Sequence, residues 1–100
     1  MSLEKTMSEH RRLTILRVLE KAPGYSANCS IIKDSVVGFG INSSRDQVRN
    51  EMRWLAEQGL LQLEDLGIVM VGKLTDDGLE VARGNLVREG VKRPSPFERR

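Results

Sequence analysis

Glycine and proline divide this sequence into short apolar segments, and that division limits the folds open to it. Pro23-Gly24 ends a first periodic segment, Gly38-Phe39-Gly40 ends a second, and Gly59 ends a third. Residues of these types stop helices or mark turns. No apolar segment of the sequence approaches the roughly 18–20 residues that a membrane-spanning helix needs. The chain is therefore predicted to fold as one small domain built from several short elements.

The first two segments are predicted to be helices. Between Ser8 and Ala22, leucines at positions 13, 16 and 19 recur at helical intervals. Ser26 is placed to cap a second, short helix that ends near Gly38. We interpret Cys29, in the first turn of that helix, as a packed structural cysteine. Residues 1–7 carry no clear period, so we expect a flexible N-terminus, in part of cloning origin.

A third helix is predicted from about Arg45 to Gln58. Ser44 and Gln47 match the S-x-x-Q capping box, in which two side chains satisfy the first backbone amides of a helix. Apolar residues then recur at helical spacing until Gly59, which stands where a left-handed C-terminal cap is expected.

Two strands and a final helix are predicted after Gly59. Residues 60–66 alternate in polarity and residues 68–74 are β-rich, which indicates a two-stranded ribbon that turns around Asp65–Gly67. Thr75 is placed to cap a last helix whose apolar positions extend to Leu86.

The positive charge of the sequence is concentrated at its C-terminus. The formal net charge is +2, but four basic residues and one acidic residue give residues 92–100 a charge of +3, which leaves residues 1–91 at −1. From Gly90 the apolar period disappears, and Pro94 and Pro96 disfavour helix. We therefore expect a domain over residues 8–89 and a basic, proline-containing tail over residues 90–100.

The predicted order of elements resembles the winged helix-turn-helix family. Residues 44–48 open the candidate recognition helix, residues 54–61 lead from it into the wing, and residues 74–79 look like the junction after the wing. The resemblance extends from Ser8 to Arg83 and implies an α+β fold: a three-helix winged helix-turn-helix with a two-stranded wing and a C-terminal helix.

A narrower resemblance concerns the source of the chain. Residues 25–61, together with the terminal residues 90–96, are similar to small winged-helix proteins of Mu-like phages and prophages. One fold can host unrelated functions, so this similarity bears more on the architecture and the genetic setting than on the biochemical role.

In winged-helix proteins that bind DNA, the third helix enters the major groove and the wing reaches an adjacent groove or the backbone. Here that helix carries Arg45, Arg49 and Arg53 at intervals of four, on one flank. We therefore expect a double-stranded DNA-binding protein of phage or prophage origin that acts as a transcriptional regulator. Its expected contacts are Ser44 orienting the helix start, Arg45 and Arg49 at the backbone, Asn50 and Arg53 at bases, and Arg11, Arg12 and Lys73 at phosphates.

A protein-interaction adaptor on the same scaffold is the alternative hypothesis. Asp46 and Glu57 share the outward sector of the third helix, and Glu64 and Asp65 lie at the predicted wing turn, where they would repel phosphate. Trp54 projects away from the apolar stripe and is expected to pack against this chain or a second copy. The chain is therefore expected to bind DNA or, alternatively, a phage or host protein, and its state as monomer or homodimer stays open.

The sequence does not indicate an enzyme. His10 is the only histidine and Cys29 the only cysteine, so neither an internal disulfide nor a usual zinc set can form within one chain. Asp76 and Asp77 suit a helix start better than a catalytic pair. We expect no catalytic residues, no metal, no cofactor and no membrane partner, and a cytoplasmic location.

Overall fold

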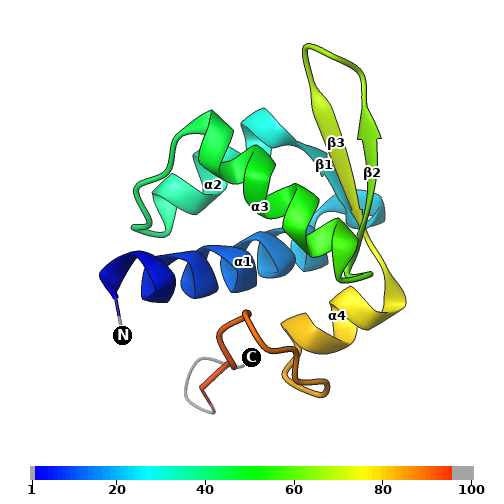
Figure 1. Ribbon diagram of the computed structural model, residues 1–100. Helices are drawn as coiled ribbons and strands as arrows, with labels where there is room; N and C mark the ends of the chain where they lie inside the picture. Colours follow the sequence, from blue (N-terminus) through cyan, green and yellow to red (C-terminus); the bar gives the residue numbers. More distant parts are fainter. Residues whose placement is uncertain (1, 96–100) are drawn as a thin grey trace.

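A mixed α+β architecture is seen over residues 2–95, which are the residues that the structure, a computed structural model, describes (Figure 1). Three strands form one antiparallel sheet of order β1-β3-β2. In chain order the elements are α1 (Leu3–Lys21), the 3-10 turn η1 (Pro23–Tyr25), β1 (Ser26–Asn28), α2 (Cys29–Gly38), α3 (Arg45–Glu57), β2 (Leu61–Asp65), β3 (Met70–Leu74) and α4 (Asp76–Ala82).

Helix α1 is the centre of the packing. Helices α2 and α3 lie on one side of it and α4 on the other, while the sheet closes one end (Figure 1). Leu16 and Leu19 of α1, Ile32 of α2, and Met52 and Leu55 of α3 are completely buried. Burial of a side chain of this size contributes about 1.5–3 kcal/mol, so these contacts are the main source of stability.

The predicted caps of α3 and α4 and the predicted turn after α3 are confirmed. Ser44 Oγ accepts a hydrogen bond from the backbone N–H of Gln47 at 3.1 Å, and the Gln47 side chain accepts one from the N–H of Ser44 at 2.9 Å. Thr75 Oγ1 caps α4 by accepting from the N–H of Gly78 at 3.0 Å. Gly59 has φ +77°, a left-handed conformation that side chains disfavour.

One strand was missed by the sequence prediction. Ser26 does not cap α2, because Ser26–Asn28 form β1 and pair antiparallel with β3. The cap is Asn28, whose Oδ1 accepts from the N–H of Ile31 at 2.9 Å. Three residues are too few to show an alternating pattern, and serine and asparagine have little strand preference. The hydrogen bonds of β1 come from the edge of β3 that β2 leaves unpaired, and a local sequence pattern does not reveal that edge.

The limits of the first and last helices also differ from the prediction. Helix α1 begins at Leu3 with Ser2 as its cap, so most of the segment expected to be flexible is helical. Helix α4 stops at Ala82 and does not reach Leu86. Its C-terminal turn leads into Gly84, which has φ +82°.

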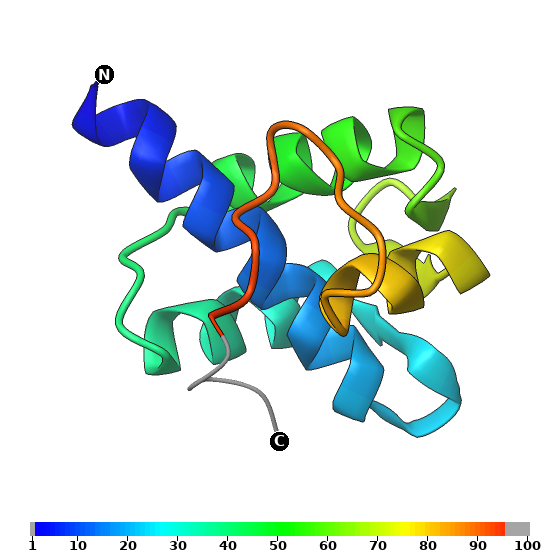
Figure 2. The ribbon, with the colours of Figure 1, turned by 90° about the horizontal axis from the view of Figure 1, so that it is seen from below.

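Over its described residues, 90–95, the basic tail packs against the domain. Residues 84–95 cross α1 on the side away from α2 (Figure 2). The N–H of Lys92 donates to the carbonyl of Glu9 at 3.1 Å, and the Val91 side chain is buried. Arg99 and Arg100, two of the four basic residues of the tail, lie outside the described residues.

The close approach of α4 to the chain before β2 gives a prediction about Gly78. A Cβ at this position would lie 2.1 Å from the carbonyl oxygen of Leu60 and 2.9 Å from Cδ1 of Leu74. We expect Gly78→Ala to lower the free energy of unfolding by at least about 2 kcal/mol in urea denaturation, because backbone must move. Gly38→Ala is the control, since a Cβ at Gly38 meets nothing within 4 Å. Equal stabilities of the two variants would contradict the packing described.

Candidate nucleic-acid interface

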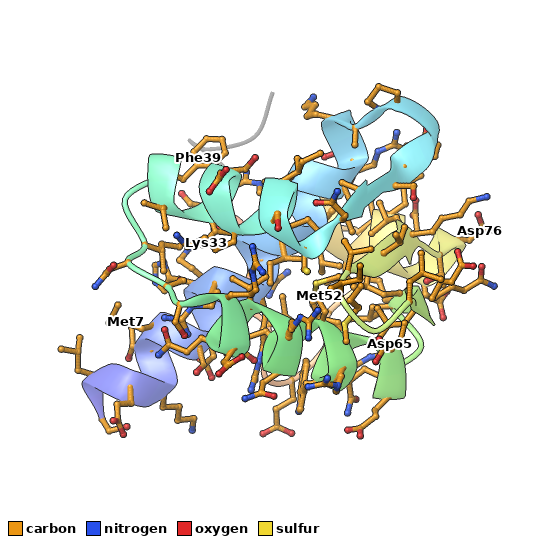
Figure 3. The ribbon with its side chains drawn as sticks, turned by 90° about the horizontal axis from the view of Figure 1, so that it is seen from above. Met7, Lys33, Phe39, Met52, Asp65 and Asp76 are labelled. Carbon is orange, nitrogen blue, oxygen red and sulfur yellow. The ribbon has the colours of Figure 1, made fainter. Side chains whose placement is uncertain are left out.

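One face of the molecule is built by α2, the outer side of α3 and the tip of the β2–β3 hairpin (Figure 3). We call this hairpin the wing. The exposed side chains of α3 on this face include Arg45, Asp46, Asn50 and Arg53. Their placement follows from the helical period, because Val48, Met52 and Leu55 turn the opposite side of α3 into the core. Within the described residues, neither α1 nor residues 83–95 cover this face (Figures 1 and 2).

Two of the predicted arginines lie at the surface with neutral partners. Arg45 Nη2 donates to the hydroxyl of Ser30 at 3.0 Å, which links the start of α3 to α2. Arg53 Nη1 donates to Oδ1 of Asn50 at 3.1 Å. The structure thus brings Asn50 and Arg53 together as one exposed polar pair on the middle of α3.

Arg49 has a different environment, because it reaches the wing. Its Nη2 donates to the carbonyl oxygens of Gly67 at 3.3 Å and Ile68 at 3.1 Å. These two residues form the turn between β2 and β3. Arg49 therefore braces the tip of the wing against α3 while keeping its positive charge on the candidate interface.

The other side of Arg49 faces a buried thiol. Cys29 is fully buried, as the sequence predicted for a structural cysteine. Burial raises the pKa of Cys29, but a backbone hydrogen bond from Met70 and the Arg49 side chain outweigh burial, so the pKa lies below its ordinary value. The same contact with Cys29 raises the pKa of Arg49. The Nε atom of Arg49 is itself buried, and it has no conventional hydrogen-bond partner within residues 2–95.

Arg11 is not available to phosphate, and that expectation is corrected. Its side chain is buried between α1, α3 and the loop before α3. Arg11 Nε donates to Ser43 Oγ at 2.7 Å, Nη2 donates to the carbonyl of Asn42 at 3.2 Å, and Nη1 lies 3.5 Å from Oε2 of Glu51. Moving this guanidinium to a DNA backbone would leave a buried carboxylate without this partner.

Arg12 is also engaged inside the protein. Its Nε donates to Oε1 of Glu51 at 2.8 Å, and its Nη1 donates to the carbonyl of Gly90 at 2.9 Å. Its guanidinium carbon stands 3.9 Å from the centre of the Trp54 ring, a cation–π contact. Trp54 thus packs against its own chain, which is one of the two alternatives expected for it, the other being a second copy. Arg12 joins α1, α3 and the C-terminal segment and is not placed at the candidate interface.

Lys73 lies on a different surface from the arginines of α3. On β3, a Cβ at Gly72 would point at the Met52 side chain of α3, so the neighbouring Lys73 points to the opposite face of the sheet. Lys73 also pairs with Ser26 and Gln62 at the base of the wing, not at its tip. The structure therefore does not bring Lys73 together with the arginines of α3.

The charges of the face are mixed, but its arginines and carboxylates are not paired. Within residues 2–95, Arg45, Arg49 and Arg53 form no ion pair. Asp46 and Glu57 are exposed on α3, and Asp46 and Asp65 are near enough to contribute to the raised pKa of Arg49. The arginines of this face would attract an anionic partner, and its carboxylates would repel one.

Sequence reasoning missed Glu51, although a signal was present. Glu51 stands three residues after Val48 and four before Leu55, so it falls on the buried stripe of α3. A carboxylate on such a stripe requires a cationic partner inside the protein. Arg11 and Arg12, which we assigned to phosphate, are those partners.

Other kinds of site find no support in the part of the chain that is described. Within residues 2–95, no three histidine, cysteine, aspartate or glutamate side chains come together in a way that could hold a metal ion. Over the same residues, none of the helices has the length and apolar character needed to cross a bilayer.

Comparisons with known proteins place the chain among phage-related sequences. Protein gp26 of Escherichia phage Mu, an uncharacterized protein, is 46% identical over 90 residues, which cover 90% of this chain and 93% of gp26. An uncharacterized protein of Haemophilus influenzae is 40% identical over 97 residues, which cover 96% of this chain and 94% of that protein. No protein-family model matches this chain.

The buried cluster around Glu51 gives a testable consequence for stability. Glu51→Gln removes the carboxylate but retains the shape, which leaves two guanidinium groups in the interior without their counter-charge. We expect the free energy of unfolding to fall by about 2–4 kcal/mol, measured by urea denaturation. Glu57→Gln, an exposed change on the same helix, is the control and should change stability by less than about 0.5 kcal/mol. A Glu51→Gln protein as stable as this control would show that the cluster is dispensable.

Proposed function

This chain belongs to the family that includes gp26 of Escherichia phage Mu, and within that family we propose that it binds double-stranded DNA as a winged helix-turn-helix protein and regulates transcription. In this proposal it has no catalytic role. The proposal takes the phage relationship as its setting and rests on the surface of α3 for its chemistry.

The topology supports the winged-helix part of the proposal. The order α1-β1-α2-α3-β2-β3, with a sheet of order β1-β3-β2, places a wing directly after the helix that would enter the major groove. Six residues separate α2 from α3, and Arg11 fixes their loop to α1. In such a domain α3 is the recognition helix.

The observation that carries the proposal is the contrast between two groups of arginines. Arg11, Arg12 and Arg83 are held in ion pairs with glutamates. Arg45, Arg49 and Arg53, all on α3, instead hydrogen-bond to neutral oxygens and keep their charge for a partner. DNA phosphates carry the negative charge that these arginines would attract, and they recur at regular intervals along the duplex.

The proposed roles follow from the position of each side chain. Ser44 fixes the start of α3, and Arg45 beside it engages the DNA backbone. Asn50 and Arg53 approach base edges, where an amide can pair with adenine and a guanidinium with guanine. Arg49 supplies charge and holds the wing. We remove Arg11, Arg12 and Lys73 from the proposed contacts because the structure directs them elsewhere.

An adaptor that binds a phage or host protein remains the second candidate. The specific observation in its favour is the apolar C-terminal end of α2, where Phe39 is 73% exposed and Val37 is 40% exposed. Apolar residues grouped in this way occur at protein interfaces. A second copy of the chain is one partner of this kind.

The test is recovery of DNA from a pool of fragments of a Mu-like phage genome, followed by titration of the recovered fragment at several salt concentrations. We expect the double variant Arg45→Ala/Arg53→Ala to bind at least tenfold more weakly and to show a salt slope lower by about 1, since the one phosphate contact assigned to Arg45 is lost.

Arg83→Ala is the matched control, because Arg83 is a surface arginine that pairs with Glu20 beside α4. This variant should bind the fragment as the unaltered protein does. Absence of binding by the unaltered protein at 50 mM salt or below would refute DNA binding and favour the adaptor. Equal losses in the control and the double variant would refute a role specific to α3.

A further inference from the structure

The tip of the wing is a turn in which most backbone polar groups already have hydrogen-bond partners. Leu66 donates its N–H to the carbonyl of Val69 at 2.8 Å, and Ile68 donates to the carbonyl of Leu66 at 3.1 Å. Asp65 Oδ1 accepts from the N–H of Gly67 at 2.9 Å. The carbonyls of Gly67 and Ile68 accept from Arg49. The turn therefore offers a partner little besides its side chains.

Those side chains are apolar and exposed. Ile68 is 89% exposed, the highest value for a large apolar side chain within residues 2–95, and Leu66 is 54% exposed. The intervening Gly67 has φ +86° and contributes no side chain. Two apolar groups are thus held outward on a braced turn. Exposure of this kind is costly in water and typical of a surface that is covered by a partner.

Duplex DNA is the partner that the surroundings of the tip favour. The side chain that holds the tip is an arginine, and the same helix presents Arg45 and Arg53 without ion pairs over the described residues. The Asp65 carboxylate is held by the turn and lies near Arg49, which reduces its repulsion of phosphate, whereas the exposed Glu64 beside it on β2 keeps its negative charge.

We propose that the Leu66–Ile68 tip is an apolar wedge that enters the minor groove beside the site of α3 and opens a base step, bending the DNA. This inference rests on the proposed function and adds a mode of binding to it. Paired strands have axes about 4.8 Å apart, and their atoms and side chains extend well beyond those axes, so only the side chains of the tip would enter a groove about 6 Å wide. Apolar side chains inserted in this way kink duplexes by roughly 20–90°.

The experiment measures affinity and DNA bending separately. The DNA is the recovered phage fragment, carrying a donor and an acceptor dye at its two ends, and bending is read as energy transfer at saturating protein. The variants are Leu66→Ala/Ile68→Ala, which removes the wedge, and Ile68→Leu, which retains an apolar group of the same size. Val87→Ala is the control, because Val87 is 60% exposed on the segment after α4.

The double variant is expected to bend the DNA much less than the unaltered protein at saturation and to bind roughly tenfold more weakly. Ile68→Leu and Val87→Ala should retain both properties. The salt slope of the double variant should be unchanged, because no phosphate contact is removed. Circular dichroism and denaturation of each variant would show that the fold is retained, since both side chains are exposed.

Three outcomes would overturn the wedge. Unchanged bending and affinity in the double variant would refute it while leaving DNA binding by α3 intact. Loss of self-association in light scattering, with DNA bending unchanged, would assign the tip to a second copy. Failure of the unaltered protein to bind any fragment would refute the proposed function and the wedge together.

Discussion

The buried Glu51 carboxylate of α3 fixes the positions of α1, the loop before α3 and the C-terminal segment relative to one another. Its two oxygens accept from Arg11 and Arg12, which lie side by side on α1. Arg11 extends the network to the loop before α3, and Arg12 extends it to Gly90 in the C-terminal segment. A buried ion pair of this kind contributes little net stability compared with apolar packing, but each member is costly to lose. Its effect is to fix how α3 lies on α1.

This placement separates the charges of α3 into an inner and an outer set. Glu51 is neutralised inside by two cations, so the negative charge of that residue does not reach the outer face. Arg45 and Arg53 remain outside with neutral partners. The outer face therefore carries the arginines of α3 together with Asp46 and Glu57, and within residues 2–95 these charges are not paired with one another. Net charge alone would not have revealed this arrangement.

The sequence predicted what depends on near neighbours. The capping box of Ser44 and Gln47 and the left-handed turn at Gly59 are decided within a few residues, and both are confirmed. Strand β1 depends on a partner about 45 residues away, and the contact of Arg12 with Gly90 spans 78 positions. Such contacts leave no local period. For the candidate site, the outward position of Arg45 and Arg53 was predictable. The position of Glu51 on the buried stripe implied an internal cation, but the sequence could not show that Arg11 and Arg12 supply it.

Arg49 shows why α3 and the wing act as one surface. A hairpin that extends beyond a sheet is usually mobile, because few contacts hold its tip. Here one guanidinium spans from α3 to two carbonyls of the turn. The tip and the helix therefore keep a fixed spacing before any partner arrives. A prearranged spacing reduces the ordering cost of binding, so both elements can engage a rigid repeating partner at once.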